Sequence, residues 1–178
     1  MGKPKYLYHA SAAGNIEQLK PRSITMPQGF CEGPVVFATD CFAFATQFIV
    51  SSDDSWANGG AIGGVYFFVI SDKARFSRVD KGGCVYLVPS VSFNKYNKRE
   101  WYSKKTVKVV SKVCFDSGLG AMIINDVQVY FVAKSVYKKI QASSDHGAKI
   151  LNGLPCENEK WGLRVEKFDI YRGSKEKI

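Results

Sequence analysis

Histidine and closely spaced metal ligands are scarce in this sequence. The chain has two histidines in 178 residues, and its cysteines form no Cys-x-x-Cys pair. A structural zinc site needs closely spaced Cys or His ligands, so no metal centre is expected. An odd number of widely spaced cysteines predicts reduced thiols rather than a disulfide framework. The five cysteines are Cys31, Cys41, Cys84, Cys114 and Cys156.

Long apolar runs, targeting signals and phosphate-loop motifs are missing as well. The longest mostly apolar run, Ala61 to Ile70, is far below the roughly 20 residues that span a bilayer. The first 14 residues contain no continuous apolar core of the kind found in signal peptides. The Gly-rich and Ser-rich segment from Ser51 to Gly64 has no phosphate-loop pattern and is expected to be a flexible connector. These absences predict a soluble, cytoplasmic protein.

Acidic residues are fewer than basic ones, 16 against 25, and the net charge is +9. This balance favours anionic partners such as nucleotides or nucleic acid. The segment from Asn94 to Lys112 is the most basic, and Tyr96, Trp101 and Tyr102 are interleaved in it. Basic side chains can track phosphates and aromatic rings can stack on bases, so the segment suits a nucleotide or a single strand. It also suits a solvated loop and strand edge, where lysines discourage pairing between sheets. Both interpretations stay open. The basic residues are Lys95, Lys98, Arg99, Lys104, Lys105, Lys108 and Lys112.

Strands outnumber helices in the predicted secondary structure. With 46% apolar residues, the chain is expected to form one domain over residues 1–178, with a frayed tail at 172–178. Short apolar or alternating runs between turn residues predict an α+β fold with mostly antiparallel sheet. The expected strands are Tyr6–Tyr8, Val35–Phe37, Val65–Ile70, Cys84–Val88, Thr106–Val113, Val127–Val132 and Leu163–Tyr171, of which Val65–Ile70 is central.

Two helices and one helical turn are expected. Cys41 to Val50 predicts a helix capped by Thr39 or Asp40, with Cys41, Phe44, Ala45 and Phe48 on its core face. The second helix is expected at Lys134–Gln141, with Val136, Tyr137 and Ile140 facing inward. The turn is expected at Asn15–Lys20, whereas Ser143–Lys160 is expected to be irregular.

Two residues are candidates for catalysis. His9 follows the first strand directly and is well placed to face a cleft, whereas His146 lies in a Ser/Asp/Gly loop. A hydrogen-bonded structural histidine is the equal alternative for His9. Glu100 is the only acid in the basic segment, and the surrounding cations should keep it ionised. Its alternative is a surface ion pair with Arg99 or Lys98.

Three short blocks, YHAS, VVFATD and REWYS, together resemble the ADP-ribosyltransferase-like fold of the His-Tyr-Glu type. The poly(ADP-ribose) polymerases and diphtheria-type toxins belong to that group. The resemblance implies a split, mostly antiparallel sheet with NAD in its cleft. It implies that His9 holds the adenosine-side ribose and the carboxamide end of NAD. It also implies that Ser11 matches the small hydroxyl residue that often follows this histidine in the family. It also implies that Phe37 stacks on nicotinamide and that Glu100 polarises the 2′-hydroxyl of the nicotinamide ribose.

The match has departures. Ala10 stands where the family usually has Gly, and Phe37 stands where it usually has Tyr, although stacking needs only the ring. Because pyrophosphate needs cations, the pocket is expected to be bordered by Arg22, Lys104 and Lys105. Thr39 is expected to contribute to cofactor binding. The acceptor of the ADP-ribosyl group is undetermined. A nucleotide-binding or nucleic-acid-binding member of the fold without catalysis is the alternative function.

Overall fold

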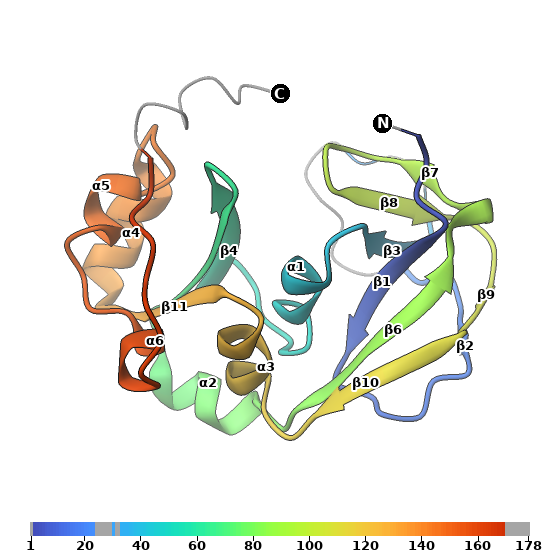
Figure 1. Ribbon diagram of the computed structural model, residues 1–178, viewed down its shortest axis with the longest axis horizontal. Coiled ribbons are helices and arrows are strands. Elements are labelled where there is room, and N and C mark those ends of the chain that lie inside the picture. Colours follow the sequence, from blue (N-terminus) through green and yellow to red (C-terminus); the bar gives the residue numbers. More distant parts are fainter. Residues whose placement is uncertain (1, 24–29, 31–32, 170–178) are drawn as a thin grey trace.

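Two β-sheets dominate the computed structural model of this protein, which describes residues 2–23, 30 and 33–169 (Figure 1). The larger sheet is antiparallel and has the strand order β10-β6-β1-β3-β8-β7. The smaller has the order β11-β5-β4, with β11 parallel and β4 antiparallel to β5. The strands are β1 (Tyr6–Ser11), β2 (Gln18–Leu19), β3 (Val36–Thr39), β4 (Ala57–Ile62), β5 (Val65–Ile70), β6 (Gly83–Pro89), β7 (Asn94–Lys95), β8 (Glu100–Ser103), β9 (Val107–Lys108), β10 (Ser111–Phe115) and β11 (Val127–Phe131).

The helices are short. The longest in the described part of the chain has nine residues, and no candidate membrane span is found there. The helices are α1 (Phe42–Thr46), α2 (Lys73–Val79), α3 (Gly118–Ile124), α4 (Lys134–Ala142), α5 (Ala148–Leu151), α6 (Glu157–Lys160) and the 3₁₀ helix η1 (Ser90–Ser92).

Helices α1 and α3 lie between the two sheets (Figure 1). Ala45 of α1 and Ala121 of α3 are buried together with Val85 of the larger sheet. The next two residues of α3, Met122 and Ile123, are fully buried against the smaller sheet. Small side chains therefore face one sheet and larger ones the other, so that a single short helix contributes to the cores of both.

The carboxylate of Asp80 fixes the start of α3. The backbone N–H groups of Gly118 and Leu119 donate to it at 2.6 and 3.0 Å, and the Ser117 hydroxyl donates at 3.0 Å. A carboxylate at this position satisfies N–H groups that have no partner within the helix. Asp80 thereby ties the end of α2 to the start of α3 across the intervening strands.

Strand β1 joins its two neighbours unequally. It pairs with β6 along its whole length, from Tyr6 to Ser11. It pairs with β3 at one register position, where Tyr8 lies opposite Thr39, whereas β3 pairs with β8 at four positions. Pairing between β1 and β3 in the larger sheet is therefore limited to this one residue pair.

The predicted α+β class with mostly antiparallel sheet is confirmed, as is the central strand Val65–Ile70 with its bounds. Strands were also expected where β1, β3, β6 and β11 lie, and a helix where α4 lies. The predicted tail at 172–178 falls outside the described residues.

Three predicted segments are wrong because distant parts of the chain decide their structure. Asn15–Lys20 forms no helical turn, since Leu19 pairs with Val107 in the small β2–β9 ladder. The expected connector Ser51–Gly64 contains the whole of β4, which forms a hairpin with β5. Residues 163–169 form no strand, because Phe168 donates its N–H to the Asn152 side chain instead.

Other predicted bounds and faces also need correction. The expected strand Thr106–Val113 is divided between β9 and β10, and the expected irregular stretch 143–160 contains α5 and α6. Helix α1 is shorter than Cys41–Val50, and Cys41 itself is its N-cap residue. Phe48, expected in the core, is 50% exposed, whereas Ile49 is buried. The chain leaves the helix after Thr46, so the helical spacing no longer applies there.

The prediction of reduced cysteines is wrong for Cys84 and Cys114, which form a disulfide. They lie directly opposite each other on β6 and β10, an arrangement that sequence spacing does not show. Cys41 and Cys156 are free, and Cys31 falls outside the described residues. Because such bonds persist in oxidising environments, the disulfide favours an oxidising compartment over the predicted cytoplasm.

Candidate functional site

A cavity of about 950 Å³ opens where β1, β3 and β8 face α1 and β4. Its wall includes His9 from β1, Phe37 and Thr39 from β3, and Glu100 from β8. These strands are neighbours in the larger sheet, which explains how segments far apart in sequence share one wall. The volume is in the usual range for a small-molecule or cofactor site.

His9 is oriented by a hydrogen bond to the backbone of the neighbouring strand. Its Nδ1 lies 2.7 Å from the carbonyl oxygen of Phe37. A carbonyl oxygen only accepts, so Nδ1 carries the proton and Nε2 of the neutral ring is an acceptor. Burial lowers the pKa of His9, the hydrogen bond to Phe37 opposes that effect, and the positive charge of Arg22 lowers the pKa further. The neutral imidazole is therefore the form favoured at neutral pH.

This lowered pKa makes stability depend on pH. The unfolded chain protonates His9 near pH 6.5, but the folded chain resists that proton, so acid favours unfolding. The stabilisation is complete above about pH 6.5 and is lost as the pH falls through the lowered pKa. We expect the melting temperature to fall more between pH 7.5 and 5.5 in the wild type than in His9→Asn, whose amide can still donate to Phe37. His146→Asn is the control and should keep the wild-type acid sensitivity, whereas equal sensitivity of His9→Asn would contradict the assignment.

Phe37 lies in a cluster of aromatic rings at one side of the cavity. Its ring centroid is 5.1 Å from that of Phe30 and 5.9 Å from that of Tyr96. Phe30 also meets Tyr102 edge-on at 5.3 Å. Packed edges of this kind hold an aromatic side chain in one orientation. Phe37 is thus a fixed, half-buried ring on the cavity wall.

Glu100 is held by the turn that precedes β8. The Asn97 side-chain amide donates to Glu100 Oε2 at 2.6 Å, and Asn97 Oδ1 accepts from the Glu100 N–H at 2.8 Å. The pairing of Thr39 with Glu100 sets the register between β3 and β8. Two residues of the cavity wall are therefore held opposite each other by backbone pairing.

The remaining predicted site residues lie differently. Thr39 is buried on the cavity wall, and its hydroxyl accepts from the Cys41 N–H at 3.2 Å. Ser11 is not on the wall, and its hydroxyl accepts from Ala13 at the turn after β1. Arg22 and Lys104 are exposed and lie off the wall, although Arg22 is close enough to act on His9. Lys105, expected beside Lys104, is exposed and off the wall as well.

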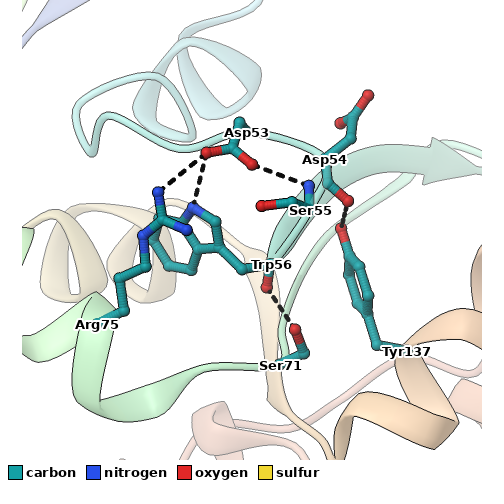
Figure 2. Close-up of polar contacts among 7 residues, drawn as sticks. All are labelled: Asp53, Asp54, Ser55, Trp56, Ser71, Arg75 and Tyr137. Carbon is teal, nitrogen blue, oxygen red and sulfur yellow. Dashed lines mark hydrogen bonds and ion pairs between the residues drawn. The ribbon is translucent and has the colours of Figure 1, made fainter.

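The opposite wall comes from the segment that was predicted to be a flexible connector. Ser51, Ser52, Asp53 and Asp54 all line the cavity. Figure 2 shows the Asp53 carboxylate accepting from the Ser55 N–H at 2.9 Å, from the Trp56 indole at 3.2 Å and from Arg75 at 3.1 Å. Hydrogen bonds from Ser55, supported by Arg75 and Trp56, lower the pKa of Asp53.

A second set of contacts fixes the same segment from below (Figure 2). The backbone carbonyl of Asp54 accepts from the Tyr137 hydroxyl at 3.0 Å and from the Gln141 side chain at 2.8 Å. The carbonyl of Trp56 accepts from the Ser71 hydroxyl at 2.9 Å. The loop is therefore anchored to α4 and to the end of β5. The Ser and Gly content of the segment predicted a flexible connector instead. The signal in the sequence that pointed to an ordered loop was the single large aromatic residue, Trp56, which the structure buries.

Acidic side chains outnumber basic ones on this cavity wall. Asp53, Asp54 and Glu100 line it, and no described lysine or arginine does. Nowhere in residues 2–23, 30 and 33–169 do three or more His, Cys, Asp or Glu side chains form a group that could hold a metal ion. The second histidine, His146, lines a different cavity of about 460 Å³. The site therefore offers one neutral imidazole, carboxylates and a ring.

The aromatic residues of the basic segment are largely packed. Trp101 is 6% exposed and belongs to a core cluster with Leu7 and Phe93. Tyr96 and Tyr102 are half-buried around Phe30. These rings are thus engaged within the fold, although the side chains of Lys95, Lys105, Lys108 and Lys112 are exposed.

Comparison with protein-family models, with curated proteins and with solved structures finds no match for this chain. A fold by itself does not establish a function, which depends on the chemistry of a site. The function must therefore be inferred from the residues of the cavity, and the family to which they point is a proposal.

Proposed function

We propose that this protein is an NAD-dependent ADP-ribosyltransferase with an ADP-ribosyltransferase-like fold. The single observation that carries the proposal is that His9, Phe37 and Glu100 share the wall of one cavity. They come from three strands and span most of the first hundred residues. A transferase needs an imidazole, a ring and a carboxylate within reach of one nicotinamide riboside.

Each of the three side chains has a role in this proposal. The Nε2 atom of His9 accepts a hydrogen bond from a ribose hydroxyl, since its Nδ1 proton is committed to Phe37. The Phe37 ring stacks on nicotinamide. Glu100 accepts a hydrogen bond from the 2′-hydroxyl of the nicotinamide ribose. Its negative charge stabilises the positive charge that develops on that sugar.

The reaction is a displacement at the nicotinamide ribose. The bond between ribose C1′ and the pyridinium nitrogen breaks, and its electron pair leaves with nicotinamide. The sugar passes through an oxocarbenium-like state of the kind seen in other glycosyl transfers. An acceptor oxygen or nitrogen then bonds to C1′ and loses a proton. The acidic wall suits this charge distribution because NAD carries its positive charge on the nicotinamide ring.

The pyrophosphate of NAD needs cations, and in this proposal they come from outside the cavity wall. No described lysine or arginine lines the cavity, but two arginines act on its wall residues: Arg22 on His9 and Arg75 on Asp53. Arg75 is engaged in its ion pair with Asp53. In this proposal Arg22 approaches the phosphates from the rim, and the exposed Lys104 and Lys105 contribute at longer range.

A direct assay with adenylate-labelled NAD tests the proposal. We expect the wild-type protein to bind NAD in calorimetry and to release nicotinamide, with label transferred to a protein, nucleic-acid or small-molecule acceptor supplied in separate reactions. Water is an acceptor in the absence of these. Failure to bind NAD, to release nicotinamide and to transfer label would remove the assignment.

An oligonucleotide-binding measurement, made beside the NAD assay, tests the alternative of a nucleotide-binding or nucleic-acid-binding protein without turnover. The exposed lysines of residues 94–112 favour it. Affinity for a single-stranded oligonucleotide that falls steeply with salt, together with no nicotinamide release, would support that alternative.

A further inference from the structure

A buried glutamine on the cavity wall has an unused hydrogen-bond donor. Gln47, the C-cap residue of α1, is 3% exposed and lines the cavity. Its Nε2 atom has no hydrogen-bond partner within the described part of the chain. Buried donors are nearly always paired, because an unpaired one loses its bonds to water without replacement. An unsatisfied donor beside a cavity therefore calls for an explanation.

The fold makes room for this side chain. A Cβ atom at Gly59 of β4 would collide with Gln47 Oε1 and approach Phe68 at 2.8 Å. Gly59 has no positive φ, so the turn-forming property of glycine does not explain it. The absence of a side chain at Gly59 is what allows Gln47 to lie against β4.

Nearby polar groups are already engaged. The Thr46 hydroxyl donates to the Ala43 carbonyl at 2.7 Å, and the Asn58 amide donates to Asp54 Oδ1 at 3.0 Å. Thr46 and Asn58 therefore have hydrogen-bond partners, whereas the Nε2 atom of the adjacent Gln47 has none in the described part of the chain.

We infer that Gln47 is a ligand-specificity residue whose Nε2–H donates to a neutral oxygen or ring nitrogen of the molecule bound in the cavity. The inference rests on the proposed NAD site and adds a recognition group to it. A neutral acceptor is specified because Asp53 and Asp54 line the same cavity and disfavour an anionic one. Nicotinamide and ADP-ribose both carry such acceptors, so they must be tested separately.

Calorimetry with NAD, ADP-ribose and nicotinamide is the test, on the wild type and on Gln47→Met, which keeps the volume and removes the amide. NAD should bind about 3- to 10-fold more weakly to the variant, as for one lost hydrogen bond. The same loss with ADP-ribose alone or nicotinamide alone identifies which half carries the acceptor. Gln47→Glu, which keeps an oxygen but not the donor, should lose at least as much affinity.

The melting temperature separates recognition from support of the fold. Removing an unpaired donor should leave Gln47→Met within about 2 °C of the wild type or above it. The control is Gln128, a buried glutamine off the cavity wall whose amide donates to Glu166 and accepts from Tyr130. Gln128→Met should melt at least about 2 °C lower with its NAD affinity unchanged.

Three results would overturn the inference. Wild-type affinity of Gln47→Met or Gln47→Glu for all three probes would overturn it and leave the NAD site standing. A fall in melting temperature of Gln47→Met as large as that of Gln128→Met would assign Gln47 to the support of the fold. A wild-type protein that binds none of the three probes would remove the proposed function and this inference together.

Discussion

Replacing Glu100 by glutamine is expected to slow nicotinamide release from NAD by about 100- to 1,000-fold, the usual effect of removing one preorganised electrostatic group. Glutamine keeps an oxygen that can accept from Asn97, so the turn before β8 should be retained. What is lost is the negative charge beside the sugar, which matters most when positive charge develops in the transition state. NAD affinity should therefore change by less than about 3-fold, as expected for an interaction made mainly in the transition state.

Nicotinamide release and calorimetric NAD binding, measured on the same preparations, check this expectation. Glu17→Gln is the matched control, since Glu17 is exposed and does not line the cavity. It should keep wild-type activity. A Glu100→Gln variant with an unchanged rate would show that this carboxylate does not act on the reacting sugar. A variant that loses binding and rate equally would make Glu100 a residue for ground-state binding.

Breaking the Cys84–Cys114 bond is expected to cost about 3 to 4 kcal/mol of folding free energy. The two cysteines are 30 residues apart in sequence, and their bond restricts a loop of that size in the unfolded chain. For a chain of this length, the loss corresponds to a melting temperature lower by about 6–16 °C. Thermal unfolding with and without reductant measures the difference.

The double variant Cys84→Ala/Cys114→Ala controls for other effects of the reductant. It should melt near the reduced wild type and show no further change with reductant. The unfolded, unreduced wild type should offer no more than three titratable thiols, because Cys84 and Cys114 are bonded and three of the five cysteines remain. Five titratable thiols would restore the prediction of a fully reduced chain.

Local sequence was a sound guide wherever the chain carries its own signal. The continuous apolar run VYFFVI predicted the central strand β5, which the structure confirms. Good strand formers likewise predicted β1. Of the three residues expected to face inward from α4, Tyr137 and Ile140 are buried and Val136 is partly buried. Helix α3 was missed because GLGAMII has no helical pattern of its own and depends on the carboxylate of Asp80.

The residues of the candidate site could be chosen from local sequence, but their meeting in one cavity could be expected only from the family resemblance. His9, Phe37 and Glu100 could be chosen because each stands in a short block with a chemical rationale. The family resemblance implied that they meet in one cleft, but local pattern alone could not show it, since their common wall depends on the neighbouring order of β1, β3 and β8. Gln47 gave no sequence signal, because an unpaired donor is a property of packing and not of residue type.

The sequence by itself determined the α+β class, the basic charge, the strongest strands and the short list of chemically useful residues. Tertiary structure alone decided the β2–β9 ladder, the Cys84–Cys114 bond and the anchored loop before β4. The physical reason is that strand pairing, disulfides and cavity walls join residues that are distant in sequence. The free energy of each such contact depends on which distant residue is the partner, and the local sequence pattern does not identify that residue.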